Sequence, residues 1–425
     1  MIGSNAPHSP DRNAPWMFWR LLHPGIGVEE WRDASVHAAY LLRELPAARH
    51  ADDPAELVDM ILTERQFGQG HWNLTPAKRA YYMYVRPLLP AWVRPFLRRA
   101  LLVPQGERSL LRWPVEDRYV RYQFAMLRHL LERIGESSVQ YLRLWPHEAR
   151  YALALTHDIE TAKGQEFVRE VAALEERYGF RSAFNFVAED YPLDEKLLGE
   201  LRERGFEVGL HGLKHDGRLF LSRREFERDA MRINRHLKRL NVVGFRAPFT
   251  HRNPEWMQAL EIEHDSTFFD TDPFETINGG TMSIWPFMMG HFVELPFTLP
   301  QDHTLLSMVG ENSPDIWLRK IDFIERHRGM AMTISHPDYL RDRRFFEVYE
   351  EFLRQMSGRE GYWHALPTEI ARWWRMRADA PALDRESLLA ALPGASIGTI
   401  RLGSADAEMV DESDVLVVAP EEPER

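Results

Sequence analysis

The sequence predicts an α/β fold in which a mostly parallel sheet closes into a barrel, preceded by a mainly helical domain. Short apolar runs alternate with helical segments between residues 149 and 378. Charged and imidazole side chains recur at the ends of these runs, as expected when an active site occupies the carboxyl face of a barrel. An open doubly wound sheet would also fit the alternation. The polar residues at nearly every strand end favour the closed barrel.

The region 16–148 has a different pattern and is predicted to form the helical N-terminal domain. Asp53 can cap a helix whose first position suits Pro54, and residues 117–136 repeat apolar side chains at helical spacing. The aromatic, proline-rich stretch from Tyr81 to Phe96 fits packing against a neighbour, and a ligand or membrane role is the alternative. Residues 1–15, rich in Pro, Asn and Ser, are predicted to be flexible.

Seven apolar runs are predicted as strands, and helices are expected between them. The strands are residues 151–156, 182–187, 206–210, 242–245, 259–264, 291–296 and 330–335. The main helices are 164–180, 192–204, 223–240, 313–328, 341–357 and 367–377. Residues 379–425 form an acidic extension that is expected to be partly disordered, with two small strands at 399–402 and 415–419.

Composition excludes several classes of protein. The formal net charge of −11 argues against a nucleic-acid partner, because phosphate neutralisation needs a basic face. The absence of cysteine excludes disulfides and thiolate metal sites. No window is apolar enough for an integral membrane segment, and the N-terminus does not resemble a signal peptide. We therefore expect a cytoplasmic protein.

The first candidate metal ligands are His211 and His215. In HGLKH they are four residues apart, so both imidazoles face the same way on a helical turn. Chance spacing of 18 histidines in 425 residues gives roughly 0.8 such pairs, so the spacing alone is a weak signal. Their position directly after a predicted strand, with Gly209 and Gly212 permitting close backbone approach, strengthens it. Surface or capping histidines are the alternative.

The second candidate group is THDIE, which follows the strand at 151–156. In an extended chain Asp158 and Glu160 point to the same side. One carboxylate could complete a triad with the two histidines while the other acts as a base. Such a triad leaves an open position for water and substrate, which is typical of a catalytic site. A helix N-cap is the alternative interpretation of Asp158.

Other strand ends supply further candidates. Arg246, in GFRAP, can clamp a carboxylate, and His336, in ISHP, is available as a general acid. Asp265 is expected to orient His336 and support its charge. Glu294 and Phe249 are candidate substrate-binding residues. A surface salt bridge for the arginine, and structural roles for the others, are the alternatives.

Taken in order, THDIE, HGLKH, RAPF, HDSTFFD and ISH resemble the motifs of the polysaccharide deacetylase (NodB-homology) family, carbohydrate esterase family 4. The resemblance covers about residues 149–375. It implies a distorted (β/α)7 barrel that holds a divalent metal, often zinc, through one carboxylate and two histidines.

By this resemblance His211 and His215 are metal ligands, and His336 is the acid. Asp158 matches the base and Arg246 the residue that holds it. Ile159 stands where the family usually has a second aspartate, and Glu160 fits a variant in which the metal carboxylate lies two residues after the base.

The sequence therefore predicts a metal-dependent deacetylase that hydrolyses an N-acyl, and specifically an N-acetyl, group of an amino sugar or glycan. One alternative is an amidohydrolase acting on a small non-sugar C–N bond. The other is a catalytically silent glycan-binding protein, and the metal carboxylate is the feature that separates it from the enzymes.

Overall fold

The computed structural model describes residues 10–68, 70–90, 93, 100, 109–380, 385–403 and 415–418. The flexibility expected of residues 1–9 and the disorder expected at the extreme C-terminus concern positions outside these ranges. Within 10–15, Asn13 exchanges two hydrogen bonds of 2.8 Å with the backbone of Met288.

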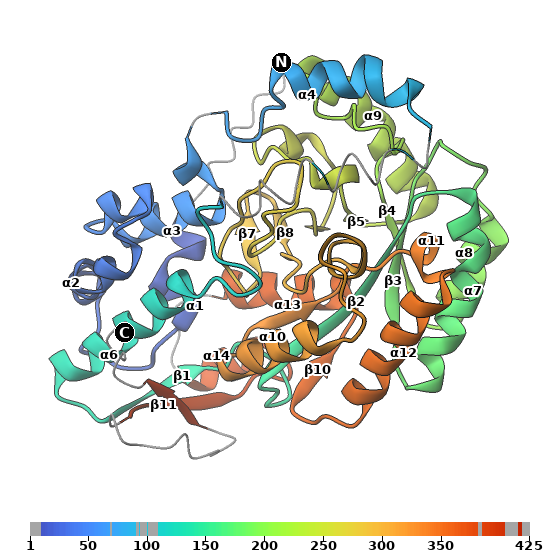
Figure 1. The fold of residues 1–425 in the computed structure, drawn as a ribbon. Coiled ribbons are helices and arrows are strands. Elements are labelled where there is room, and N and C mark those ends of the chain that lie inside the picture. Colours follow the sequence, from blue (N-terminus) through green and yellow to red (C-terminus); the bar gives the residue numbers. More distant parts are fainter. Residues whose placement is uncertain are drawn as a thin grey trace.

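A nine-stranded sheet forms the centre of the molecule (Figure 1). Its order is β10-β2-β3-β4-β5-β6-β8-β7, and β9 also pairs with β2. Every pair is parallel except β7–β8. The strands are β2 (Tyr151–Ile159), β3 (Ser182–Phe186), β4 (Glu207–Leu210), β5 (Gly244–Phe245), β6 (His264–Asp265), β7 (Phe287–Met289), β8 (Phe292–Glu294), β9 (Met330–Met332) and β10 (Tyr362–His364).

The sheet curls until the chain beyond β8 lies against β9. The backbone N–H of Leu299 donates to the carbonyl of Met332 at 3.1 Å, and the Thr298 hydroxyl donates to the carbonyl of Met330 at 2.7 Å. These bonds replace regular strand pairing at the closure, which makes the barrel a distorted one. The predicted fold class is confirmed.

Each of the seven predicted strands overlaps a strand of the central sheet, although the segment at 259–264 shares only His264 with β6. Three strands were missed: β7 and β10 in the central sheet, and β1 (Ser138–Leu142) outside it. The central strand β2 is buried along its whole length. A parallel strand covered on both faces is expected to be continuously apolar, as YALAL is.

Helices cover the outside of the barrel and begin where local signals place them. Ser222 caps α9 by accepting a hydrogen bond from the backbone of Glu225, and Thr161 and Asp194 cap α7 and α8 in the same way. The helices are α7 (Ala162–Arg177), α8 (Glu195–Glu203), α9 (Arg223–Leu240), α10 (Asp315–Arg326), α11 (Pro337–Leu340), α12 (Arg343–Ser357) and α13 (Pro367–Asp379).

The N-terminal region is mainly helical, as predicted. Asp53 caps α3 and Pro54 is its first residue, and Gly135 ends α6 in a left-handed conformation. The elements are η1 (Pro10–Asn13), α1 (Pro15–Trp19), α2 (Val28–Ala38), η2 (Ala39–Leu42), η3 (Pro46–His50), α3 (Pro54–Leu62), η4 (Arg65–Phe67), α4 (Pro76–Ala80), η5 (Tyr81–Val85), η6 (Arg86–Leu88) and α6 (Arg118–Ile134).

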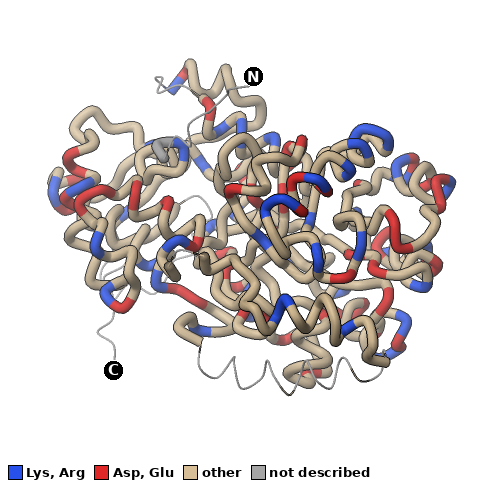
Figure 2. The backbone as a smooth tube through the Cα atoms, turned by 90° about the horizontal axis from the view of Figure 1, so that it is seen from above, with Lys and Arg blue, Asp and Glu red and all other residues tan. Residues whose placement is uncertain are grey.

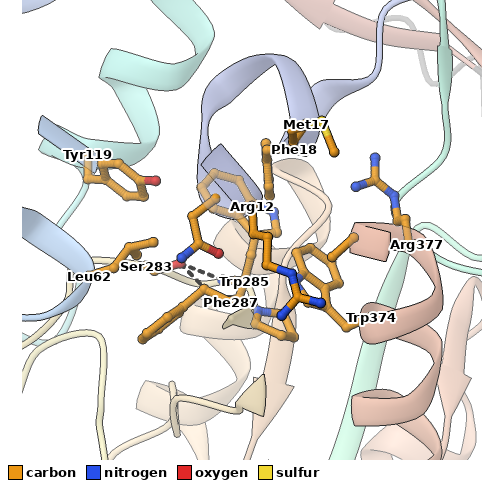
Figure 3. A pocket seen from close by; sticks show the side chains of 13 residues that line it. Arg12, Met17, Phe18, Leu62, Tyr119, Ser283, Trp285, Phe287, Trp374 and Arg377 are labelled. Carbon is orange, nitrogen blue, oxygen red and sulfur yellow. Dashed lines mark hydrogen bonds between the residues drawn. The ribbon is translucent and has the colours of Figure 1, made fainter. Parts of the chain in front are cut away.

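Aromatic side chains join this region to the barrel (Figure 3). The Phe18 ring lies 5.1 Å from that of Trp285 and 5.9 Å from that of Trp374, and Tyr119 lies 6.2 Å from Trp285. The space left between them is a cavity of about 20 Å³, room for one or two water molecules. One continuous hydrophobic core therefore runs from the N-terminal helices into the barrel.

A small three-stranded sheet lies beside the N-terminal helices. It contains β1 (Ser138–Leu142), β11 (Ile397–Leu402) and β12 (Val415–Val418), and α14 (Arg385–Ala391) precedes β11. The last two strands coincide with the short strands predicted in the C-terminal extension.

Acidic and basic residues are interspersed along the chain seen from above (Figure 2). Among the residues that the structure describes, no helix has the length and apolar character that crossing a membrane requires.

A buried ion pair connects the N-terminal region to the loop after β5. Arg252 donates two hydrogen bonds of 2.6 Å to the two carboxylate oxygens of Glu64, and neither side chain is exposed. The same guanidinium donates to the carbonyls of Thr250 and Ile277 and lies 4.4 Å from the ring of Phe269. Breaking one side of such a pair leaves an uncompensated buried charge.

We predict that Glu64→Gln lowers the free energy of unfolding by about 3 kcal/mol or more, because Arg252 would stay charged and buried without its counterion. Chemical denaturation followed by circular dichroism measures the change. Glu29→Gln is the matched control, because Glu29 forms only an exposed pair with Arg32 and should change stability by less than about 0.5 kcal/mol. Equal stability of the two variants would contradict the assignment.

Candidate active site

Carboxyl ends of parallel strands bring the candidate residues together. Asp158 is the penultimate residue of β2 and Glu160 follows that strand. His211 comes directly after β4, Arg246 comes directly after β5, and His336 precedes α11 a few residues beyond β9. The prediction that these strand ends share one site agrees with their placement.

Glu160, His211 and His215 each offer one ligand atom, and these atoms lie within 4.8 Å of one another. The Nε2 atom of His215 is 3.1 Å from Oε1 of Glu160. One carboxylate with two imidazoles is a donor set suited to a divalent transition metal. These three residues could therefore hold a metal ion.

The ring of His211 is oriented by the backbone. Its Nδ1 lies 3.1 Å from the carbonyl oxygen of Arg246, which makes Nδ1 the donor and leaves Nε2 as a ligand atom. Burial lowers the pKa of His211 to about 4, so the imidazole is neutral at physiological pH. A neutral imidazole is the form that binds metals.

The loop carrying His215 depends on close packing. Gly212 has a φ of +70°, and a Cβ there would lie 2.8 Å from the ring of Pro248. The Phe249 ring stacks on His215 at 4.2 Å between centroids. The close backbone approach expected at this glycine is present, and it brings the RAPF segment against the second histidine.

Asp158 is held by one of its two carboxylate oxygens. Oδ1 accepts hydrogen bonds from Arg246 Nη1 and Asn185 Nδ2, both at 3.0 Å. Oδ2 lies 3.8 Å from the His211 ring. Burial alone would raise the pKa of Asp158, but the Arg246 charge and the neighbouring histidines outweigh burial and lower the pKa to about 2. The side chain is thus a carboxylate with one oxygen free of the Arg246 and Asn185 contacts.

His336 has a different carboxylate partner from the one expected. Its Nδ1 lies 2.6 Å from Oδ1 of Asp302, and its backbone N–H donates to Oδ2 of the same residue at 2.8 Å. Burial would lower the pKa of His336, but Asp302 and, to a smaller extent, Glu160 raise it to about 10. The expectation that Asp265 orients His336 is wrong.

Asp265 and Glu294 instead contact each other beneath the site. They are paired in register on the neighbouring parallel strands β6 and β8 and are fully buried. Asp265 accepts from the backbone and hydroxyl of Thr267. Burial, and then the charge of Asp265, raises the pKa of Glu294 well above its usual range, so Glu294 is the protonated partner. The prediction that Glu294 contacts substrate is contradicted by its complete burial.

The cavity beside the metal ligands is small. It has a volume of about 30 Å³, and Phe249, His336 and Tyr339 contribute to its wall. Phe249 and Thr250 have φ values of 60° and 52°, an unfavourable conformation for residues with side chains. The Thr250 hydroxyl donates to Glu275 at 2.7 Å, which supports that conformation. Phe249 therefore lines the cavity beside the metal ligands.

Three polar side chains that shape the site are not among the residues predicted from the sequence. Asn185 supports Asp158, Asp302 supports His336, and Gln301 donates to Glu275 at 2.7 Å on the cavity wall. The sequence could have indicated Asn185, because it is the polar residue inside the apolar strand SAFNFV. It could not have indicated Asp302 and Gln301, because they follow a stretch without periodicity.

A second hydrogen-bonded cluster lies on the outer side of β2. The Ser335 hydroxyl is 2.8 Å from Nδ1 of His157, whose Nε2 is 2.7 Å from Glu175. Ser182 and Tyr349 also donate to Glu175. The histidine and glutamate are fully buried, and only 1% of Ser335 is exposed, so this Ser–His–Glu arrangement has no access for a substrate. It fixes β2 against β9 and α7.

The family model described as polysaccharide deacetylase matches residues 147–262. This segment is similar to the polysaccharide deacetylase family. It contains Asp158, Glu160, His211, His215 and Arg246, while His336 lies beyond it. The predicted resemblance is confirmed, and with it, at the level of the family, the expectation of a hydrolase of the deacetylase type. No curated protein matches the chain.

Several solved structures are similar to this chain over about half of its length. A protein described as a polysaccharide deacetylase from Mycobacterium smegmatis is 17% identical, with 54% of this chain and 92% of that chain covered and a TM-score of 0.45. One from Pseudomonas aeruginosa PAO1 is 16% identical, with coverages of 54% and 93% and a TM-score of 0.45. The peptidoglycan deacetylase PdaC from Bacillus subtilis is 13% identical, with coverages of 56% and 96% and a TM-score of 0.36.

We predict that Glu160→Ala weakens zinc binding by more than about 100-fold, because it removes a ligand. Asp158→Ala should weaken it by about 100-fold at most, as for groups that only orient ligands. Calorimetric titration of zinc into each purified apoprotein measures both constants. Glu170→Ala, at an exposed position of α7, is the matched control and should bind as the unchanged protein does. Loss of binding in Asp158→Ala with retention in Glu160→Ala would make Asp158 the ligand.

Proposed function

We propose that this protein is a metal-dependent deacetylase that hydrolyses the N-acetyl group of an amino sugar within a glycan. The family match supports deacetylation of a polysaccharide. The observation that carries the proposal is a second carboxylate, Asp158, beside a complete Glu160–His211–His215 donor set. A site that only bound metal would not need it.

The donor set fits zinc. Glu160, His211 and His215 would be the ligands, and three protein ligands leave a position open for water and substrate. A bound divalent ion would polarise the amide carbonyl and make the attacking water more acidic. The backbone carbonyl of Arg246 holds the His211 ring in the tautomer that binds metal.

Asp158 is the proposed general base. Arg246 and Asn185 hold its Oδ1, so Oδ2 is the oxygen that accepts the proton of the attacking water. Arg246 is fixed in turn, because its Nε donates to the carbonyl of Ser266 at 2.8 Å and its Nη1 to the Thr156 hydroxyl at 2.9 Å. The base is therefore oriented before substrate arrives.

His336 is the proposed general acid. Asp302 holds Nδ1, and Nε2 faces the site, 3.7 Å from Oε1 of Glu160. When the amide C–N bond breaks, Nε2 gives its proton to the leaving nitrogen. One water is consumed, and the products are acetate and a free amino sugar.

The small cavity supports an acetyl group as the acyl part. A volume of about 30 Å³ is room for two or three water molecules, so a long acyl chain would not fit without movement of the wall.

The proposal is tested by metal analysis of the purified protein together with acetate release from β-1,4-linked N-acetylglucosamine oligomers. One zinc per chain with acetate release supports it. Bound metal with hydrolysis of a small cyclic amide such as allantoin, and none of the oligomers, would favour the amidohydrolase alternative. Oligomer binding without metal or turnover would favour the silent binding protein.

We predict that Asp158→Asn keeps zinc but lowers kcat by about 10²–10⁴-fold, because the amide cannot accept the water's proton. Steady-state acetate release measures the rate, and metal analysis of the same preparation is the control. Near-normal turnover in this variant would place the base elsewhere.

We also predict that Asp302→Asn lowers kcat by at least about tenfold while zinc affinity changes little, because Asp302 orients His336 and does not touch the donor set. Asp265→Asn should leave kcat less affected, since Asp265 contacts Thr267 and Glu294. The reverse order of the two effects would restore Asp265 as the partner of the acid.

A further inference from the structure

The segment Pro76–Leu88 of the N-terminal region turns an apolar helix face toward solvent. Its helical turns α4, η5 and η6 follow one another without a break. Figure 1 shows α4 at the upper edge of the molecule, beside α9. The exposed residues of the segment recur every three or four positions, and all of them are apolar or aromatic: Pro76, Ala77, Ala80, Met83, Tyr84, Val85, Pro87 and Leu88.

Large exposed apolar side chains are concentrated in this segment. Among the residues that the structure describes there are eleven of them, and four of the eleven lie between Met83 and Leu88. Tyr84 is 65% exposed and Leu88 is 84% exposed. Single exposed apolar residues are normal on a protein surface, whereas a cluster of them on one face marks a surface for interaction.

Contacts on the opposite face hold the segment in this orientation. Tyr82 is buried, its ring lies 5.4 Å from that of Phe249, and its hydroxyl is 3.2 Å from that of Thr276. Arg86 donates a hydrogen bond of 3.2 Å to the carbonyl of His215. The predicted packing of this aromatic stretch against a neighbour therefore accounts for its inner face, and the outer face needs a separate explanation.

The charge of the surrounding chain indicates the kind of partner. In the sequence, residues 65–106 include seven lysines or arginines and no aspartate or glutamate, although the formal net charge of the protein is −11. An apolar helix face within a basic stretch of chain is typical of a helix that lies in the surface of an anionic membrane.

Two basic side chains beside this face have no carboxylate partner. Arg79 belongs to the segment, and its Nε donates to the backbone carbonyl of Leu74 at 2.9 Å. Lys214 is exposed and lines a cavity of about 440 Å³ together with Met83 and Tyr84. Within the described part of the chain, neither cation forms an ion pair with a carboxylate. Both charges are therefore available to an external anion.

The acidic side chains near Met83 and Tyr84 do not cancel this basic charge. Four basic and three acidic side chains line the cavity, and two of the acidic ones are already paired. Asp229 lies 3.1 and 3.2 Å from two arginines, and Asp216 lies 3.9 Å from a third. Charges more than about 10 Å away are largely screened at moderate salt, so the local excess outweighs the negative net charge of the protein.

We propose that Pro76–Leu88 docks on the surface of a bilayer that contains anionic lipids. Tyr84 and Leu88 enter the region between the headgroups and the acyl chains, and Arg79 and Lys214 contact lipid phosphates. A second copy of this chain fits the face less well, because a twofold contact through it would bring the unpaired basic side chains of both copies together.

Docking in this orientation brings the candidate active site close to the bilayer. The Arg86 guanidinium lies 4.8 Å from the centroid of the Phe249 ring, and that ring lines the metal cavity. The inference itself does not depend on the proposed function, because docking requires neither metal nor turnover.

The test uses the absence of cysteine, which allows one fluorophore to be attached at a chosen position of the full chain. Leu88→Cys is labelled with a nitrobenzoxadiazole dye, whose emission reports the polarity around it. With vesicles of phosphatidylglycerol and phosphatidylcholine in equal parts, we expect the emission to rise and to shift to shorter wavelength. With phosphatidylcholine alone the change should be much smaller. Val36→Cys on α2, at a residue that is 55% exposed, is the matched control and should not respond.

Sedimentation with the mixed vesicles measures the affinity of the unlabelled protein and its variants, and circular dichroism checks that each variant is folded. Combining Tyr84→Ala with Leu88→Ala should lower the affinity at least about tenfold, because the two side chains supply most of the inserted apolar surface. Arg79→Gln and Lys214→Gln should each lower it about fivefold.

Three results would overturn the inference. One is a dye at position 88 that does not respond, or that responds no more than the dye at position 36. Another is unchanged vesicle affinity in the Tyr84→Ala, Leu88→Ala variant. The third is a dimer in solution that this double variant abolishes, because a second copy of the chain would then cover the face.

Discussion

One buried guanidinium, that of Arg246, underlies the arrangement of the site. A buried charge costs free energy unless its hydrogen-bond donors have acceptors. The buried Arg246 guanidinium donates to Thr156 and Asp158 on β2 and to the carbonyl of Ser266, which follows β6. The hydrogen bonds that stabilise the buried arginine therefore also fix the position of Asp158. The backbone carbonyl of Arg246 also orients His211. Asp158 and His211, the proposed base and one proposed metal ligand, are thus placed by one residue, which follows a two-residue strand.

Local pattern predicted the strands and the residues immediately after them, because a strand end is defined within a few positions of the chain. The partner of His336 could not be found this way. Between β8 and α10 the chain runs without helical or alternating periodicity, and Asp302 reaches His336 because its backbone bonds to the carbonyl of Ile334. The choice of Asp265 failed for a related reason. Its in-register neighbour across β6 and β8 is Glu294, and two buried carboxylates share a proton more readily than either serves a distant imidazole.

The N-terminal region helps to shape the candidate active site and also stabilises the barrel. Its helices share one hydrophobic core with the barrel, so the aromatic contacts of Trp285 and Trp374 need both parts of the chain. The Glu64–Arg252 pair holds the loop that carries the strained Phe249 and Thr250. A backbone conformation of this kind persists only where surrounding contacts determine it, and here some of those contacts come from outside the family segment.

The consecutive residues His157 and Asp158 lie on opposite faces of β2, one bound to Glu175 and Ser335 and the other to Arg246. Because side chains alternate along a strand, a shift of β2 by one residue relative to its neighbours would exchange its two faces. An insertion or deletion of one residue within THDIE would turn an imidazole toward the reaction centre and bury a carboxylate among aromatic rings. Variation in length is therefore excluded from this strand, whereas the loops beyond it can change length without exchanging its two faces.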